Sequence, residues 1–138
     1  MKADLAQLGD FAKRYTAAWC SRNAFSVAAF FAPNGSISVN RTPSVGRGAI
    51  TEMAQGFMTA FPDLQLLMDD IVLQDERAVY RWTFIGTNSG PGGTGQRVRF
   101  SGFEMWKIGE DGLIAESEGH FDSADYQRQI ERGVEESQ

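Results

Sequence analysis

The spacing of the apolar residues changes once along this chain, near Pro62. Before that point apolar residues recur every three or four positions, which places their side chains on one face of an α-helix. After it they recur at every second position, which is typical of a β-strand with one buried face. Helices followed by an antiparallel meander indicate an α+β fold, in which the helices cover one face of a bent sheet.

The first part of the chain predicts helices at 4–20, 24–31 and 48–61. The first of them has the clearest apolar stripe, formed by Leu5, Leu8, Ala12, Tyr15 and Trp19. We expect Pro33-Asn34-Gly35 to end the second helix and to turn the chain before a short strand at 36–40. Pro62 is expected to end the third helix, because the residue before a proline is driven out of the helical conformation.

The second part of the chain predicts strands at 64–74, 78–87, 96–108 and 113–121. The glycine-rich segment 88–95 is interpreted as a hairpin loop, because it precedes a strand and lacks the Gly-Lys-Ser/Thr ending of a phosphate-binding loop. A last short helix is expected after Asp122 or Ser123, either of which can cap it. All of these elements fit one domain spanning 1–138.

Composition removes several classes of function. The 138 residues carry a net charge of −5, which disfavours nucleic-acid binding. Cys20 is the only cysteine and His120 the only histidine, so an intrachain disulfide and a multi-histidine metal site are excluded. Neither an apolar leader nor a run of 18 apolar residues occurs in the sequence, and we therefore expect a cytoplasmic protein.

The alternation in 96–108 places one carboxylate among large apolar side chains. Glu104 shares its parity with Phe100 and Trp106, and we assign this set to the inner, helix-facing side of the sheet. A carboxyl group in such a place is hydrated, paired with an arginine such as Arg81 or Arg99, or protonated with a raised pKa.

Small residues on the next strand predict a hollow behind that carboxylate. In 113–121 the parity of Leu113, Ala115, Ser117, Gly119 and Phe121 is assigned inward. Small side chains on one strand and large aromatic ones on the walls indicate a cavity inside the fold. The opposite parity places Glu116 and Glu118 on the outer face, where we expect a partner subunit to cover them. Trp82, on an earlier strand, is expected to belong to the same contact.

Four segments occur in an informative order and spacing: AFPDL (60–64), VYRWTFIGT (79–87), VRFSGF (98–103) and DGLI (111–114), the last leading to Phe121-Asp122 and Arg128-Gln129. Together they resemble the SnoaL-like polyketide cyclases and ester cyclases of the nuclear-transport-factor-2-like superfamily. The resemblance covers nearly the whole chain. It implies a cystatin-like cone, with three N-terminal helices packed on a curved, mostly antiparallel sheet.

The resemblance also implies a chemistry. Cyclases of this family close a ring in a polyketide ester by an intramolecular aldol reaction, with a strand carboxylate as acid–base group and without a metal or organic cofactor. The position of that carboxylate is Gly119 here, and the position of a family histidine is Trp106. An aromatic family residue near the end of the first helix matches Trp19. The resemblance implies a dimer or a higher oligomer as well. Because the helices leave the outer sheet face uncovered, we expect a homodimer through that face.

Glu104 is the residue that we expect to replace the carboxylate missing at position 119, because it lies on the neighbouring strand and faces inward by parity. An apolar pocket would raise its pKa and make it usable as an acid or base near neutrality. His120 and Asp122 are further catalytic candidates. For His120 the alternative is a structural place at the cavity mouth or an oligomer contact, and for Asp122 it is capping of the last helix.

Substrate contacts are predicted for eight residues of the inner face, namely Tyr15, Trp19, Met53, Phe57, Phe100, Trp106, Ser117 and Gly119. Three functions follow. The first is a cyclase, isomerase or lyase acting on a small apolar carbonyl compound. The second is a non-catalytic protein that binds a hydrophobic ligand, and the third is a protein-interaction scaffold whose interior is filled by side chains.

Overall fold

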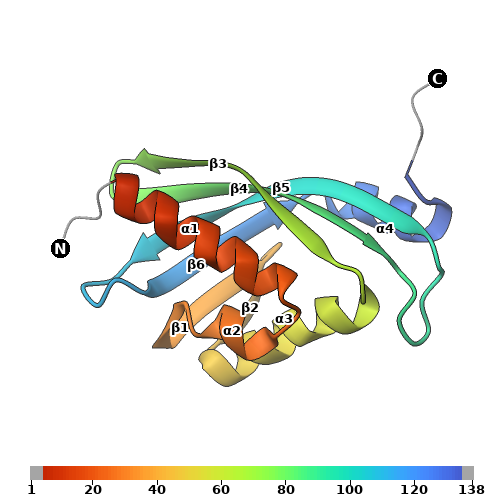
Figure 1. The fold of residues 1–138 in the computed structure, drawn as a ribbon, viewed down its shortest axis with the longest axis horizontal. Helices are drawn as coiled ribbons and strands as arrows, with labels where there is room; N and C mark the ends of the chain where they lie inside the picture. Colours follow the sequence, from red (N-terminus) through yellow and green to blue (C-terminus); the bar gives the residue numbers. More distant parts are fainter. Residues whose placement is uncertain (1–4, 135–138) are drawn as a thin grey trace.

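The computed structural model describes residues 5–134, which form a six-stranded sheet and four helices (Figure 1). The helices are α1 (Leu5–Cys20), α2 (Ala24–Ala28), α3 (Arg47–Ala60) and α4 (Ser123–Arg132). The strands are β1 (Phe31–Val39), β2 (Thr42–Val45), β3 (Gln65–Gln74), β4 (Arg77–Thr87), β5 (Arg97–Ile108) and β6 (Ile114–Phe121). The predicted α+β class is confirmed.

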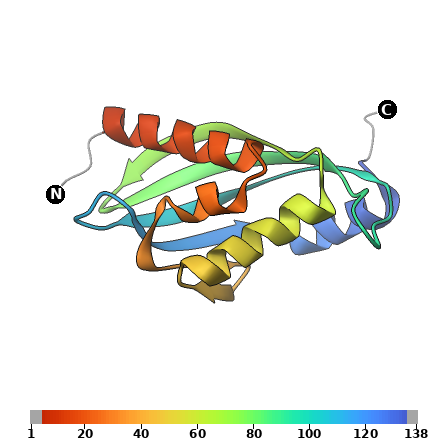
Figure 2. The same ribbon diagram turned by 60° about the horizontal axis from the view of Figure 1, so that its bottom comes forward.

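The sheet has the strand order β2-β1-β6-β5-β4-β3. Neighbouring strands are antiparallel, except that β1 runs parallel to β6. Helices α1, α2 and α3 lie on one face of the curved sheet, whereas α4 lies at its far end (Figures 1 and 2). The sheet and the three N-terminal helices thus form the predicted cone, with the core between them.

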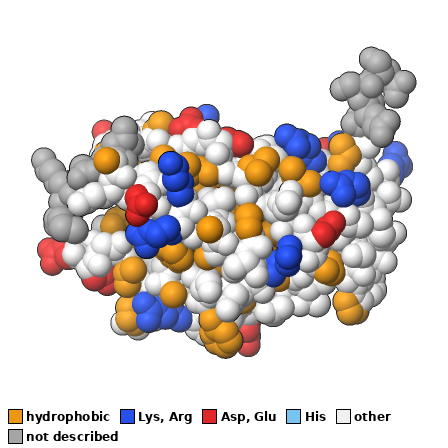
Figure 3. Space-filling view, viewed as in Figure 1, with side chains coloured by type: hydrophobic (Ala, Val, Ile, Leu, Met, Phe, Trp, Pro, Cys, Tyr) orange, Lys and Arg blue, Asp and Glu red, His pale blue; other side chains and the backbone are white. Residues whose placement is uncertain are grey.

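Helix α1 is amphipathic as predicted. Leu8, Ala12, Tyr15 and Trp19 of its apolar stripe are buried, while the side chain of Leu5 lies outside the described part. Charged side chains gather on the opposite face (Figure 3). Burial of a large apolar side chain contributes roughly 1.5–3 kcal/mol, so this stripe holds α1 on the sheet. Within residues 5–134, no helix combines the length and the apolar character that spanning a bilayer requires.

The prediction for the segment after α2 is wrong. The helix ends at Ala28, and Pro33-Asn34-Gly35 lies inside β1 rather than in a turn. The reason is an irregular bulge, because β1 advances five positions from Phe31 to Ser36 while β6 advances only two, from Ile114 to Glu116. Gly35 is needed in this bulge, since a Cβ atom there would lie 2.8 Å from the carbonyl oxygen of Ile114. Strand β2, a short edge strand, was not predicted.

A second bulge makes the predicted parity of β6 wrong at the start of the strand. The register between β5 and β6 shifts after the pair Lys107–Glu116, so that Ile108 is opposite Ile114. Ile114 is therefore the fully buried residue at the start of β6, in place of Leu113. Ser117 and Gly119 are buried, as the predicted parity requires.

Candidate active site

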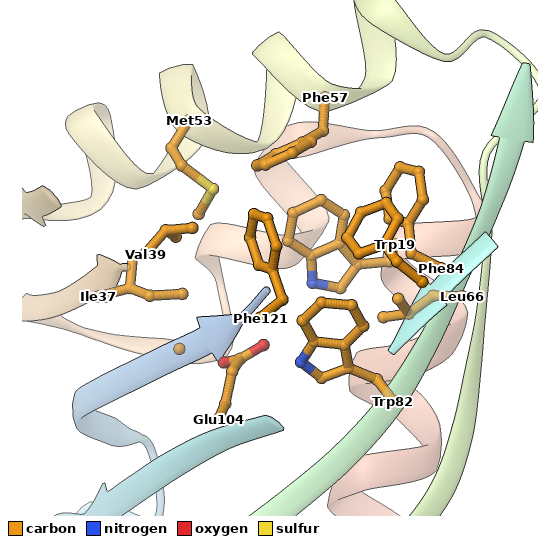
Figure 4. A pocket seen from close by; sticks show the side chains of 12 residues that line it. Trp19, Ile37, Val39, Met53, Phe57, Leu66, Trp82, Phe84, Glu104 and Phe121 are labelled. Atoms are coloured by element: carbon orange, nitrogen blue, oxygen red, sulfur yellow. The ribbon is translucent and has the colours of Figure 1, made fainter. Parts of the chain in front are cut away.

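A small pocket lies between α1, α3 and the inner face of the sheet (Figure 4). Its volume is about 50 Å³. Apart from one carboxyl group, its walls are aromatic and aliphatic side chains and one glycine. The twelve lining residues are Trp19, Ile37, Val39, Met53, Phe57, Leu66, Trp82, Phe84, Phe100, Glu104, Gly119 and Phe121. The predicted hollow is therefore present inside the cone.

Glu104 is the carboxyl group in this wall, and its side chain is held by three donors. The Trp106 Nε1 donates to Glu104 Oε1 at 2.9 Å, and the Ser117 Oγ donates to the same oxygen at 2.8 Å. The Tyr15 hydroxyl lies 3.1 Å from both carboxyl oxygens, so its single proton is shared between them. Oε1 is thus saturated with donors, whereas Oε2 keeps capacity to take up a proton or a ligand contact.

Burial governs the protonation of this cluster. Glu104 is only 6% exposed, and burial raises its pKa above the usual range. The hydrogen bonds from Trp106, Ser117 and Tyr15 favour the charged form and reduce that rise. Burial, followed by the nearby Glu104 charge, raises the pKa of Tyr15 well above its ordinary value. Tyr15 therefore keeps its proton and stays a donor, and Glu104 is the one carboxyl group of this cluster.

The strand register explains why these groups meet. Glu104 of β5 is directly opposite Gly119 of β6, and Trp106 is directly opposite Ser117. A Cβ atom at Gly119 would lie 3.6 Å from the Glu104 Cγ, which is ordinary van der Waals contact, so position 119 is a direct neighbour of the Glu104 side chain. Tyr15 reaches the same point from the buried stripe of α1.

Aromatic packing fixes the orientation of the Trp106 donor. Its ring stacks on Tyr80 with the centroids 4.9 Å apart, and it makes edge contacts with Tyr15 at 5.2 Å and Phe11 at 5.6 Å. Such packing restricts rotation of a buried ring. The indole N–H of Trp106 is therefore held toward Glu104 before any ligand arrives.

Five of the eight residues predicted as substrate contacts line the pocket: Trp19, Met53, Phe57, Phe100 and Gly119. The other three, Tyr15, Trp106 and Ser117, donate hydrogen bonds to Glu104 and do not line the pocket themselves. They can affect a ligand through the carboxyl group rather than by direct contact.

His120 and Asp122 lie away from the pocket lining. His120 is on the opposite face of β6 from Gly119, and its ring lies 5.3 Å from that of Phe103. Asp122 is the N-cap of α4, where its Oδ1 accepts a hydrogen bond from the Asp125 backbone N–H at 3.0 Å. The structure shows a packing contact for His120 and a helix cap for Asp122, and their catalytic roles stay predictions.

Trp82 is the most informative lining residue that the sequence analysis missed, because it was assigned to the outer face. Its side chain points into the pocket from β4 (Figure 4). Gly102, its direct partner on β5, makes this possible, since a Cβ atom there would lie 2.5 Å from the Trp82 ring. A tryptophan and a glycine at facing positions of a predicted hairpin were the available signal. The other missed residues are Ile37, Val39, Leu66, Phe84 and Phe121.

One polar atom of the pocket wall lacks a partner. Trp19 is only 6% exposed, and its indole N–H makes no hydrogen bond. No other side-chain nitrogen or oxygen that is buried within residues 5–134 is left in this state.

The remaining interpretations of Glu104 can now be decided. Arg81 and Arg99 are exposed, and neither forms an ion pair with Glu104. Within the described part of the chain, no cluster of three or more His, Cys, Asp or Glu side chains could hold a metal ion. Glu104 is therefore a buried carboxyl group without an ion-pair partner, and burial raises its pKa.

The size of the pocket limits what fits without movement. An apolar cavity of about 150 Å³ accommodates one benzene molecule, which is about three times the volume found here. Met53 and Phe57 line the pocket from α3 and are only half-buried. A ligand with several rings requires these side chains to move outward.

Comparisons with solved structures agree with this architecture. AclR from Streptomyces galilaeus is 21% identical, covers 98% of this chain and 87% of its own, and superposes with a TM-score of 0.79. A SnoaL-like protein from Jannaschia sp. CCS1 is 14% identical over 97% of this chain and 99% of its own, with a TM-score of 0.81. At these identities the likeness shows the fold alone.

A third structure of the same fold contains a small ligand. It is a protein with a ketosteroid isomerase-like fold from Catenulispora acidiphila, solved in complex with trimethylamine. It is 11% identical over 88% of this chain and 92% of its own, with a TM-score of 0.77. A search of curated protein sequences found no match.

The sequence itself shows the family. Residues 9–130 match the family described as SnoaL-like polyketide cyclase, a span that includes every pocket-lining residue and the three donors to Glu104. The chain therefore belongs to the SnoaL-like polyketide cyclase family.

Proposed function

We propose that this protein catalyses proton transfer on a small, largely apolar carbonyl compound held in the pocket, with Glu104 as the general acid–base. The reaction belongs to the aldol-cyclisation or isomerisation class. The observation that supports this most directly is a single buried carboxyl group in an otherwise apolar pocket, held by three donors behind it.

The hydrogen bonds assign different tasks to the two carboxyl oxygens. Trp106 and Ser117 both donate to Oε1, which fixes the plane of the group. Oε2 shares only the Tyr15 proton and is the atom that accepts and returns a proton. A carboxylate with a raised pKa is a stronger base than an ordinary one, and its acid form persists closer to neutral pH.

The proton balance of the proposed reaction is closed. Glu104 removes a proton from the carbon next to a ligand carbonyl, which leaves an enolate and a neutral carboxyl group. In cyclisation, the enolate carbon attacks a second carbonyl of the same molecule, and Glu104 returns its proton to the resulting alkoxide. In isomerisation, the proton returns to a different carbon. Neither route consumes a cofactor.

Proton exchange on a model ketone tests the proposal without knowledge of the natural substrate. 2-Tetralone in D₂O is followed by NMR with wild-type protein and with Glu104→Gln. We expect the protein-dependent exchange to fall at least about 100-fold in the variant, while the affinity changes little. Glu118→Gln, which removes an exposed carboxylate of the same sheet, is the matched control and should exchange as wild type does.

A different result would support the alternative function. If 2-tetralone binds to wild type but exchanges no faster than in buffer, the protein is a ligand-binding module without catalysis. Equal exchange in wild type and Glu104→Gln would contradict the assignment of Glu104.

We further propose a cytoplasmic homodimer that forms through the outer face of the sheet. The three N-terminal helices leave this face uncovered (Figure 2). The outer side of β5 carries Phe103 and Met105, which are half-buried in the single chain. Apolar side chains on an uncovered sheet face favour contact with another protein surface. Sedimentation should give a dimer for wild type and a monomer for Phe103→Glu, and a monomeric wild type would contradict the proposal.

A further inference from the structure

The unpartnered N–H of Trp19 is the starting observation. A donor that is buried without a partner costs roughly 1–3 kcal/mol, so such groups are rare and require an explanation. Trp19 lines the pocket, and its indole ring is oriented into it from α1 (Figure 4). The ring therefore borders the space that a ligand would fill, while the N–H itself is covered by neighbouring side chains in the free protein.

We propose that the Trp19 N–H donates a hydrogen bond to an acceptor oxygen of the ligand, namely the carbonyl oxygen of the compound class proposed above. This inference rests on the proposed function, because it concerns the same pocket. It adds a second anchor point on the wall formed by α1, on a different element from Glu104.

The polar groups of the pocket wall determine which ligand atoms can form hydrogen bonds with it. An indole offers one donor and no acceptor, and this holds for Trp82 as well as for Trp19. Figure 4 shows the Trp82 indole nitrogen on the ring edge turned toward Glu104. A carbonyl oxygen accepts from either indole N–H and brings no donor of its own, whereas an ammonium ion brings only donors and leaves both indole N–H groups without an acceptor.

Tyr15 is the competing internal partner for the Trp19 N–H. The indole lies near enough to the Tyr15 hydroxyl to favour its ionised form, yet the N–H does not reach hydrogen-bonding geometry. In the free protein the N–H is enclosed by its neighbours. The pocket must widen to admit any ligand, and we expect the same movement of side chains to open the Trp19 N–H to a ligand oxygen.

A pair of probes that differ only in the carbonyl group tests this inference. 1-Indanone has one acceptor oxygen, and indane is the same ring system without it. We expect wild type to prefer 1-indanone, and Trp19→Phe to lose about three- to tenfold of that preference. Phe25→Leu is the control, because Phe25 is 77% exposed on α2 and does not line the pocket, and its preference should equal that of wild type.

A second measurement uses the wild-type protein and therefore does not depend on whether Trp19→Phe folds. The chain has three tryptophans, so the indole N–H region of a ¹⁵N-resolved NMR spectrum contains three signals to assign. Addition of 1-indanone should shift the Trp19 signal downfield, and indane should not. A signal that responds to Tyr15→Phe but not to 1-indanone would show an internal contact and overturn the proposal.

The remaining outcomes also decide the question. Aromatic walls beside a carboxylate suit a small alkylammonium ion, so tetramethylammonium is the third probe. Tighter binding of tetramethylammonium than of 1-indanone would overturn the proposal, and so would failure of both ring probes to bind at millimolar concentration. Loss of exchange activity in Glu104→Gln is independent of these ratios, so the proposed function and this inference can fail separately.

Discussion

Trp106 lies two residues beyond Glu104 on the same face of β5 and donates its indole N–H to Glu104 Oε1 at 2.9 Å. Position 106 is where the family resemblance places a histidine. Tryptophan cannot exchange a proton at neutral pH, so its contribution here is that of a fixed donor. The hydrogen bond from Trp106 therefore favours the charged form of Glu104, the one carboxyl group in the pocket wall.

Replacement of Trp106 by Phe should raise the pKa of Glu104 further. The indole hydrogen bond favours the charged carboxylate and so lowers the pKa. Without it, the rise in pKa that burial causes is less counteracted. In the tetralone exchange assay, the pH at which activity rises should move upward. Phe103→Leu, on the outer side of the same strand, should leave the profile where it is. An unchanged profile in Trp106→Phe would mean that the residue only fills space.

Glu104→Gln should change how stability depends on pH. Because the pKa of Glu104 is raised in the folded state, the folded protein binds the proton more tightly than the unfolded chain does. Stability is then unaffected below the unfolded pKa of about 4.3 and falls as pH rises through the folded pKa. The melting temperature of Glu104→Gln minus that of wild type should increase from pH 4 to pH 8. A constant difference across this range would contradict the buried, proton-retaining carboxyl group.

Phe57→Ala should widen the pocket and admit larger ligands. Phe57 lines the pocket from α3 and is only half-buried, so its truncation should destabilise the protein by no more than about 3 kcal/mol. Binding of the three-ring ketone anthrone should improve relative to 1-indanone in a calorimetric titration. Phe25→Ala is the matched control, because Phe25 is 77% exposed on α2. If the two variants bind anthrone equally, α3 does not limit ligand size.

Gly119→Asp places a carboxyl group at the position where the family resemblance expects one. A Cβ atom there would lie 3.3 Å from the Ser38 carbonyl oxygen, which a small shift of the backbone accommodates. The new carboxylate would stand beside Glu104, and two buried like charges disfavour each other. We expect Gly119→Asp to be less stable than Gly119→Asn by about 1–3 kcal/mol at pH 8. The difference should shrink at pH 4, and denaturant titrations at both values measure it. Equal stability of the two variants at pH 8 would show that Glu104 and position 119 do not interact.

Local patterns were sufficient for most elements and for the inner face of β5. The helical spacing of α1 and the alternation around Glu104 reflect backbone geometry that neighbouring residues share. The two bulges were not predictable in this way, because extra residues in one strand are defined only by the strand that it pairs with. Pro33-Asn34-Gly35 looked like a turn for that reason, and only β6 makes it part of a strand.

The sequence by itself determined that a carboxyl group would face inward among aromatic side chains, since alternation along one strand requires no distant contact. Only the tertiary structure decided what that group meets. Tyr15 precedes Glu104 by 89 residues, and no local pattern indicates that its hydroxyl donates to both carboxyl oxygens. The unpartnered N–H of Trp19 and the width of the pocket likewise depend on how α1 and α3 pack on the sheet, because burial and hydrogen-bond geometry are properties of the assembled chain.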